Sequence, residues 1–402
     1  MTIQRKPIIV VLGMMTIMPV GGVIWQTLHY LIGFARLGFD VYYVEDHGMP
    51  PAMFSDAADP DGSARAAEFL ARILARFDLG DRWSYHAWHG NAGYHGISQN
   101  KLEQVFSRAA AVINLHGGTI PRDEHRRAGP LIYVETDPVA PEVELHNGVK
   151  ATEDFLDQHA AYFTFGENLG AADCKVPMPP AKYTFHKTRQ PVVCEFWNEH
   201  GFAARDVFTT IANWRQPERE MTLDGEVYSW SKHWEFMKFI DLPQRTNESF
   251  ELALSSYENA DRDMLAARGW RVTHALDFSG DLDRYREYIC TSRGEWTVAK
   301  DQNVRLRSGW FSDRATTYLA AGRPVITQET GFSNVLPTGC GLFAFSTMEE
   351  IVAALAMIRR DYDTHSRAAM NLARGYFDAE KVLADLLSKA GIKLPRQRHV
   401  VS

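Results

Sequence analysis

The sequence lacks the features that mark secreted, membrane-spanning and nucleic-acid-binding proteins. It has only four cysteines in 402 residues, without CxxC pairs or a zinc-like spacing with histidine. We therefore expect free thiols, a cytoplasmic location and no metal site. No run of about 18 apolar residues occurs, so we expect no integral membrane segment. The formal net charge of −7 argues against nucleic acid as a partner, because phosphate contacts need a basic surface.

The N-terminus has basic residues followed by an apolar run, an order that also occurs in signal peptides. The run IIVVLGMM, however, is followed at once by a glycine turn and by an amphipathic helical pattern. We interpret the run as a first buried strand instead.

Strand and helix patterns alternate along the whole chain, and 402 residues are too many for one hydrophobic core. A proline-rich, basic segment over 171–190 looks like a linker between two such series. We therefore predict an α/β protein with two Rossmann-like, doubly wound domains that face each other across a cleft. The predicted N-terminal domain covers 1–190, the predicted C-terminal domain covers 191–375, and a helix and tail cover 376–402. Whether this last helix packs back on the N-terminal domain is open.

The segment Arg305–Gly331 has the parts of an anion-binding unit. A loop rich in Gly, Ser and Arg leads into a predicted helix over Asp313–Ala321, and a strand and a second glycine turn follow. The N-terminus of a helix offers unpaired N–H groups and a partial positive charge, which suit a phosphate. Three arginines add charge to this segment: Arg305, Arg307 and Arg314.

Part of this segment resembles a known enzyme family. The stretch AAGRPVITQETGF, then GCGLFAF and a helix from Met348, is similar to the donor domain of glycosyltransferases of the GT-B fold, specifically over 312–361. The resemblance implies transfer of a sugar from a nucleotide diphosphate such as UDP to a small-molecule acceptor, in specialised-metabolite or glycoconjugate biosynthesis. It implies neither a metal nor another cofactor.

Two motifs of related enzymes are absent. Many retaining members carry two glutamates eight positions apart before the glycine, where this chain has Gly309 and Thr317. Inverting macrolide-type members carry a histidine in the first glycine turn, which here reads MPVGGVIWQ. The stereochemical outcome is therefore open.

The donor site is expected in the C-terminal domain. Cations there could stabilise the charge that develops on the leaving diphosphate, although each could also lie on a solvated face. Asp313 is either a helix N-cap or a ribose or sugar contact, and Glu329 and Thr330 could bind sugar hydroxyls. The candidate donor-binding residues are Gly21, Gly22, Arg215, Lys232, Arg305, Arg307, Asp313, Glu329, Thr330 and Gly331.

Catalytic candidates follow predicted strands of the first domain, where ligands lie in open α/β sheets. His116 could be a general base or a donor contact, or it could serve only the turn. Asp137 is the second candidate, as a base or an orienting group, unless an Asp-Pro turn explains it. The tract HAWHGNAGYHGISQNK could be an acceptor-recognition loop, and zinc ligation by it is disfavoured. The candidate acceptor-binding residues are Glu45, Asp46, His89 and His95.

Other functions remain open at this point. A non-hydrolysing sugar-nucleotide epimerase would share the fold, and so would a non-catalytic sugar-nucleotide-binding module. The oligomeric state, including a homodimer, is also open.

Overall fold

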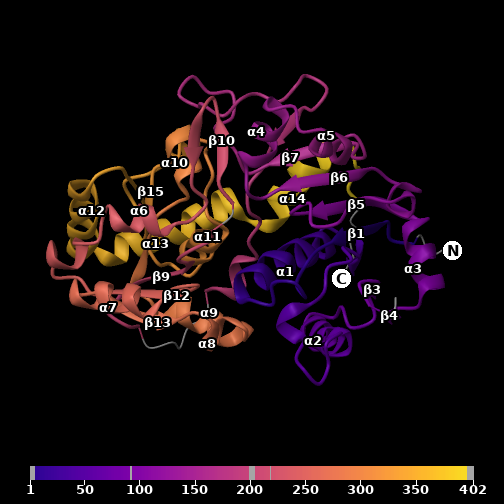
Figure 1. Ribbon diagram of the computed structural model, residues 1–402, viewed down its shortest axis with the longest axis horizontal. Coiled ribbons are helices and arrows are strands. Elements are labelled where there is room, and N and C mark those ends of the chain that lie inside the picture. The colour runs from indigo at the N-terminus through magenta and orange to yellow at the C-terminus, as the bar shows by residue number, and fades with distance from the viewer. Residues whose placement is uncertain (1–4, 91–92, 199–203, 218, 396–402) are drawn as a thin grey trace, which may run out of the picture.

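The structure is a computed structural model that describes residues 5–90, 93–198, 204–217 and 219–395. It contains two largely parallel sheets, each with helices on both faces (Figure 1). The first sheet has the order β4-β3-β2-β1-β5-β6-β7-β8, and the second has the order β13-β12-β9-β14-β15-β16. The prediction of two Rossmann-like, doubly wound sheets is confirmed.

The first domain begins with a strand, a helix and a parallel strand, as the sequence predicts. Its strands are β1 (Ile8–Leu12), β2 (Asp40–Glu45), β3 (Trp83–Ala87), β4 (Gly93–Gly96), β5 (Ala109–Leu115), β6 (Leu131–Glu135), β7 (Ala161–Thr164) and β8 (Phe185–Lys187). Its helices are α1 (Gly21–Arg36), α2 (Ser63–Ala75), α3 (Gln99–Phe106), α4 (Ala140–His146) and α5 (Lys150–Leu156).

The second domain has a short antiparallel hairpin that is separate from its six-stranded sheet. The strands are β9 (Phe208–Asn213), the hairpin β10 (Met221–Leu223) and β11 (Glu226–Tyr228), then β12 (Phe250–Ser255), β13 (Arg271–His274), β14 (Gly294–Thr297), β15 (Val325–Gln328) and β16 (Leu342–Phe345). The helices are α6 (His233–Met237), α7 (Asn259–Ala267), α8 (Leu276–Ser279), α9 (Leu282–Thr291), α10 (Asp301–Leu306), α11 (Asp313–Ala320), α12 (Met348–Arg360), α13 (Tyr362–Leu372) and α14 (Ala379–Lys389).

Strand β1 is buried on both faces, which explains its unbroken apolar sequence. Ile9 and Val11 pack in the core that includes α1, whereas Ile8, Val10 and Leu12 pack in the core that includes α3. Strand order reverses around β1, which pairs with β2 and β5, and around β9, which pairs with β12 and β14. Such switch points open a crevice at the carboxyl ends of the strands.

The last helix, α14, packs against α1 of the first domain (Figure 1). Gly33 of α1 permits the close approach, because a Cβ at this position would lie 2.5 Å from Leu383 Cδ1 and 3.1 Å from Ala379 Cβ. The end of the chain thus joins the two domains. Among the described residues, no helix is both long and apolar enough to span a membrane.

Two expectations about irregular segments need correction. The tract HAWHGNAGYHGISQNK, expected as a loop, contains the end of β3, the antiparallel strand β4 and the start of α3. The expected linker over 171–190 contains the edge strand β8. Both added strands lie at the edges of the sheet, where the sequence need not be apolar on both faces.

Candidate active site

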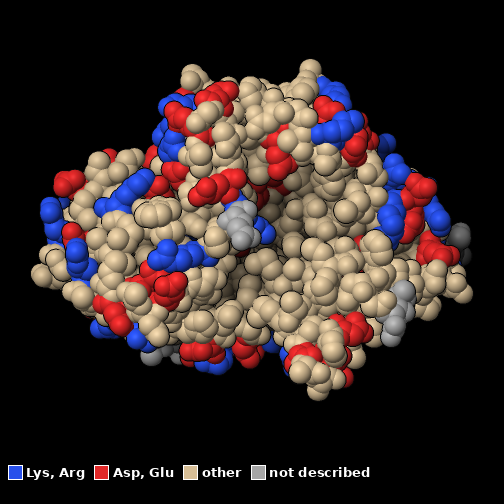
Figure 2. All heavy atoms as spheres, viewed as in Figure 1, with Lys and Arg blue, Asp and Glu red and all other residues tan. Residues whose placement is uncertain are grey.

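A cavity of about 390 Å³ lies between the two domains. The surface is hollowed there, near the middle of the face in Figure 2. The first domain contributes the loop before α1 and Met53, and the second contributes the carboxyl ends of β9 and β12. Polar groups come from the second domain: Asn213, Ser255, Ser256, Asp313 and Arg314.

Helix α11 begins at this cavity. The N-cap position is Ser312, so Asp313 is the first helical residue and not the N-cap. Asp313 lines the cavity, and burial raises the pKa of its carboxyl group. Arg314 is held by the protein itself, because its guanidinium group donates to Glu295, to Ile211 O at 2.5 Å and to Thr297 Oγ1 at 2.9 Å.

Lys232 is a partly buried cation that forms no ion pair with any of the described residues. It directly precedes α6, and its Nζ lies 5.4 Å from the centre of the Trp310 ring. Over the described part of the chain, no carboxylate lies within ion-pair distance of Lys232, and the lysine makes no side-chain hydrogen bond. Burial lowers its pKa to about 7, and the positive charges of Arg314 and Lys300 add to this effect. The position therefore favours a bound anion.

A second lysine joins the domains beside Lys232. Lys300, in the loop between β14 and α10, forms an ion pair with Asp137 at the end of β6. Its Nζ also lies 3.5 Å from the centre of the Trp230 ring. Burial lowers the pKa of Lys300 in spite of Asp137. Asp137 therefore faces the second domain, where it holds one of the two lysines.

His116 contacts Thr136, the residue directly before Asp137. It follows β5 with a left-handed φ of 66°, and its Nδ1 lies 2.8 Å from Thr136 Oγ1. Trp310 Nε1 donates to Thr136 O at 3.1 Å, so the second domain reaches the same loop. The Nε2 atom of His116 is buried without a hydrogen-bond partner, and burial lowers the pKa of the ring to about 4. The ring is therefore neutral near pH 7.

The loops on either side of α11 contact each other at the domain junction, although their residues Arg307, Glu329 and Thr330 do not line the cavity. Thr330 Oγ1 donates to Trp310 O at 2.6 Å, and Glu329 accepts from the Gly331 amide. Gly331 has a φ of 96°, and a Cβ there would lie 2.5 Å from Asn168 Nδ2 in the first domain. Arg307 pairs with Asp173 at 2.7 Å and lies 3.9 Å from Glu329. These residues thus lie together at the domain junction.

Two predicted donor-binding arginines are already engaged within their own domain. Arg215 forms a two-pronged ion pair with Asp261, at 2.6 and 3.1 Å. Arg305 pairs with Glu226 and with Asp301, and it covers the Tyr228 ring at 4.1 Å. Neither arginine lines the cavity, and neither do Lys232, Lys300 and His116, so it is the ion pairs that separate the arginines from Lys232. The predicted glycines, in contrast, do lie at the cavity. Gly22 lines it, and Gly21 lies directly against Tyr285, which also lines it.

The predicted acceptor residues Glu45 and Asp46 are buried and hold neighbouring loops. Glu45 accepts from Thr16 N at 3.0 Å and from the Tyr43 hydroxyl at 2.5 Å, which fixes the loop after β1. Asp46 binds Arg122 and two histidines: His86 at 3.0 Å and His125 at 3.2 Å.

The two remaining acceptor candidates lie at the β3–β4 edge. His89 lies 3.0 Å from Asp61 Oδ1, and the His95 ring stacks on Tyr85 with ring centres 5.9 Å apart. Neither histidine lines the cavity.

One cluster has the spacing of metal ligands. Asp46, Glu124 and His125 lie close enough together to hold a metal ion. Arg122, however, contacts both carboxylates, with Nε 2.7 Å from Glu124 Oε1. The protein's own guanidinium group thus supplies the positive charge that a metal ion would bring.

Sequence reasoning missed several residues of the site. Lys300 carries one signal, because it lies three residues beyond the end of β14. The tryptophans beside the two lysines carry no such signal, since indole rings usually belong to the core. The missed residues are Trp230, Lys300, Trp310, Asn213, Ser255, Ser256 and Tyr285.

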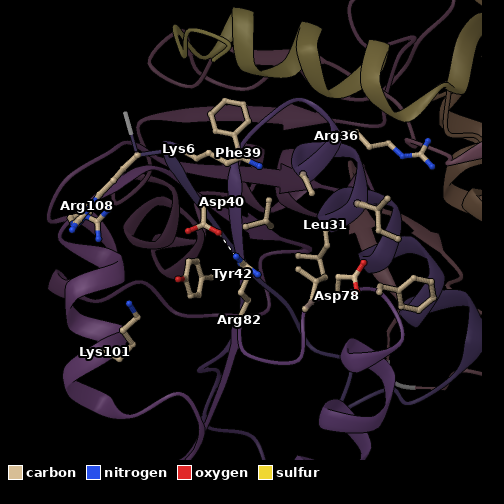
Figure 3. Close-up of a pocket in the computed structure, with 16 residues that line it drawn as sticks. Lys6, Leu31, Arg36, Phe39, Asp40, Tyr42, Asp78, Arg82, Lys101 and Arg108 are labelled. Atoms are coloured by element: carbon tan, nitrogen blue, oxygen red, sulfur yellow. Dashed lines mark hydrogen bonds and ion pairs between the residues drawn. The ribbon is translucent and has the colours of Figure 1, made fainter. Parts of the chain in front are cut away.

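A larger hollow, of about 670 Å³, lies at the opposite edge of the first sheet (Figure 3). Lys101 and Arg108 lie on one side of it, and the ion pair of Arg82 with Asp40, at 2.7 Å, lies near its centre. The C-terminal ends of α1, α2 and α3 converge at this edge, and cations offset the partial negative charge of helix C-termini. Because ligands bind at the carboxyl ends of parallel strands, the smaller cavity between the domains is the candidate active site.

Comparisons with known proteins agree with this architecture. No protein-family model and no curated protein matches the sequence. Among solved structures, an α-glucosyltransferase in complex with UDP matches 96% of this chain and 100% of its own, with a TM-score of 0.58 and 9% identity. HepE of Anabaena, in complex with UDP and glucose, matches 96% and 100%, with a TM-score of 0.55 and 12% identity. AviGT4, a glycosyltransferase of avilamycin A biosynthesis, matches 96% and 97%, with a TM-score of 0.52 and 12% identity.

The protein has the GT-B fold. This confirms the fold expected from the sequence, since the matches span nearly the whole chain and the chain forms two largely parallel, doubly wound sheets. Within this GT-B fold, the cavity, the two lysines and His116 all lie where the carboxyl ends of the two sheets meet.

Proposed function

We propose that the protein is a glycosyltransferase that moves a sugar, a hexose in the first instance, from a nucleotide diphosphate to a small-molecule acceptor without a metal ion. One observation carries the proposal: Lys232 lies partly buried at the domain junction, its pKa is lowered mainly by desolvation, and it forms no ion pair with any described residue. The GT-B fold and solved structures with bound UDP support UDP as the first nucleotide to test. The pattern of cysteines favours a cytoplasmic enzyme.

The two lysines fit the diphosphate of the donor. Its negative charge increases as the bond to the sugar breaks, and a cation that is already desolvated stabilises that charge more strongly than one in water. Lys232 meets this requirement, and Lys300 lies near enough to lower the pKa of Lys232. A nucleotide diphosphate would in turn satisfy the buried charge.

The cavity fits the nucleoside. Its volume of about 390 Å³ lies within the usual range of small-ligand pockets, which is roughly 300 to 1,000 Å³. Asp313, with its cavity-facing carboxyl group, is placed to accept hydrogen bonds from ribose hydroxyls. Asn213 and Ser255 supply neutral polar groups for the base.

His116 and Asp137 would serve the sugar side. Because the ring of His116 is neutral, it cannot neutralise a phosphate, but its nitrogen lone pair can accept a proton or a hydrogen bond. Asp137 would hold Lys300 and keep the two domains aligned. In the reaction, the bond between sugar C1 and the phosphate oxygen breaks and a bond from C1 to the acceptor oxygen forms. The hydroxyl proton passes to a base, for which His116 is the candidate.

A thermal-shift screen tests donor binding. UDP, GDP, dTDP and ADP would be compared, each with its sugar derivatives, because a ligand of the folded state raises the melting temperature. We expect a shift with one nucleotide and its sugars, which Lys232→Met should remove. A screen without any shift would refute the proposal.

Incubation with the nucleotide sugar alone then tests the reaction. Formation of an epimer without acceptor would indicate an epimerase instead. Binding without turnover on any acceptor would indicate a non-catalytic module.

A further inference from the structure

The loop between β6 and α4 carries contacts from the first domain to the second. Thr136 O accepts from Trp310 Nε1 at 3.1 Å. The next residue, Asp137, forms the ion pair with Lys300. Helix α4 continues this contact, because it lies beside β10 of the second domain (Figure 1). We call residues 136–139 the junction loop.

The junction loop ends at Val139 in a strained conformation. Val139 has a φ of 94° and a ψ of −43°, a region that residues with a branched Cβ rarely adopt. Its side chain is fully buried in a hydrophobic cluster that includes Leu306 and Tyr228 of the second domain. Strained backbone persists only where the surrounding structure fixes it. Packing against the second domain is one such constraint.

Glu142 supplies a second constraint on Val139. It lies in the first turn of α4, and its Oε2 accepts from the Val139 amide at 2.8 Å. Glu350 makes the same kind of contact at the start of α12, where it accepts from the Thr347 amide at 3.0 Å, but Glu350 is exposed. Glu142, in contrast, is only 1% exposed. Water cannot replace a lost partner there, so its contact with Val139 is more constraining than an ordinary helix cap.

A second buried carboxyl group holds Glu142 in place. Glu135 ends β6 and forms a hydrogen bond with Glu142, while it accepts another from Thr164 Oγ1. Burial raises the pKa of Glu135 well above its ordinary value, and the negative charge of Glu142 adds to this effect. Glu135 therefore favours its protonated form, which donates to Glu142. Among the described residues, Glu135 Oε1 and Glu142 Oε1 have no other partner, so this shared proton satisfies both.

We propose that Glu142 is a positioning residue for sugar transfer, which fixes the junction loop through the Val139 amide and, with the loop, Asp137 and its contact to the second domain. Glu142 does not line the cavity, so it would act only through the loop. Without Glu142, a movement of the loop would release the strain at Val139, and Lys300 would lose its fixed partner. The inference rests on the proposed function, since the contacts of the loop belong to the proposed donor site.

Hydrogen exchange of the ligand-free protein, followed by mass spectrometry of its peptides, tests this role. Glu142→Ala should speed exchange roughly tenfold in residues 136–145 and also, across the junction, in residues 299–311. Glu142→Gln should exchange like the wild type, because its amide oxygen can accept from Val139 and its amide nitrogen can donate to Glu135. Glu142→Asp keeps the charge but not the reach, so it should act like Glu142→Ala and serves as a second variant where the alanine variant does not fold.

Glu350→Ala is the matched control. It removes the same kind of contact at α12, so it should speed exchange near Thr347 but not in residues 299–311. Unchanged exchange in residues 299–311 of the alanine and aspartate variants of Glu142 would overturn the inference, because Glu142 would then serve only its own helix. An effect of Glu142→Gln as large as that of Glu142→Ala would overturn it as well.

Calorimetric titration with UDP-glucose separates this inference from the proposed function. Glu142→Ala should bind UDP-glucose roughly tenfold more weakly, whereas Glu142→Gln and Glu350→Ala should stay within about twofold of the wild type. Unchanged affinity of Glu142→Ala would overturn the inference and keep the proposed donor site. If the wild type does not bind UDP-glucose while the exchange effect still crosses the junction, the proposed function is refuted and Glu142 keeps its role in holding the junction loop.

Discussion

Lys232→Met should stabilise the ligand-free protein. The lysine pKa falls from 10.5 to about 7 on folding, and each unit corresponds to about 1.4 kcal/mol, so the buried charge costs up to about 4 kcal/mol at pH 7. Because the folded pKa is depressed, the unfolded chain binds more protons between pH 7 and 10.5. The cost is therefore full below pH 7 and disappears as the pH rises towards 10.5. Methionine keeps most of the side-chain volume and removes this cost at every pH.

The same substitution should weaken donor binding. Hydrogen bonds to charged groups contribute about 1.5 to 3 kcal/mol, which corresponds to a loss of roughly 10- to 150-fold in affinity for UDP-glucose. In the wild type, affinity should also fall as the pH rises above 7, by up to about tenfold per unit, because Lys232 loses its proton. The variant should lack this pH dependence.

Calorimetric titration with UDP-glucose at pH 6.5, 7.5 and 8.5 measures the affinities, and thermal melts without ligand measure the stabilities. Lys101→Met is the control, since Lys101 is an exposed lysine at the opposite edge of the first sheet. Lys101→Met should change neither the affinity for UDP-glucose nor the melting temperature. Equal affinity of Lys232→Met and the wild type, or a lower melting temperature of the variant without ligand, would refute the reasoning.

Three further substitutions test other parts of the site. His116→Gln should lower the transfer rate roughly 100-fold in steady-state assays, because it removes the proposed base. The affinity for UDP-glucose should stay within about threefold, because the wild-type His116 ring, with a pKa of about 4, is neutral. A large loss of UDP-glucose affinity would contradict this. Arg305→Gln should bind UDP-glucose within about twofold of the wild type in the same titrations, because its charge is paired elsewhere. Gly331→Ala should lower the melting temperature, at a cost of about 1 to 3 kcal/mol, because its φ is positive and Asn168 lies 2.5 Å from the new methyl group. Gly148→Ala, at a positive φ without neighbours within 4 Å, should cost less.

The central part of the fold was predictable because its strands are covered on both faces. Such strands appear as continuous apolar runs between glycine turns, and β1 and β9 were both located from the sequence. The edge strands β4 and β8 were not located. Each is short, and its residues are exposed or only partly buried. The continuous run of apolar residues that marks a central strand is therefore missing.

The sequence indicated which types of residue lie at the candidate site, but not which of them form ion pairs with other side chains. The sequence indicated cations at strand and helix ends of the second domain, yet it could not show which of them are already paired with a carboxylate. Arg215 is paired by Asp261, which lies 46 positions away, and Lys300 is paired by Asp137, which lies 163 positions away. Such partners are fixed only when the chain folds, so sequence position alone could not place Lys232 ahead of Arg215.

The difference in pairing separates the roles of the two lysines. A phosphate that binds a paired cation must compete with a carboxylate that is already in place, so the net gain is small. Lys232 has no such competitor among the described residues, and its full interaction is available to the donor. If Lys300 moved away from Asp137, both charged groups would lose their ion-pair partner while still partly buried. The two groups belong to different domains. Lys232 would therefore supply most of the affinity for the diphosphate, whereas Lys300 would make that affinity depend on whether the two domains are correctly aligned.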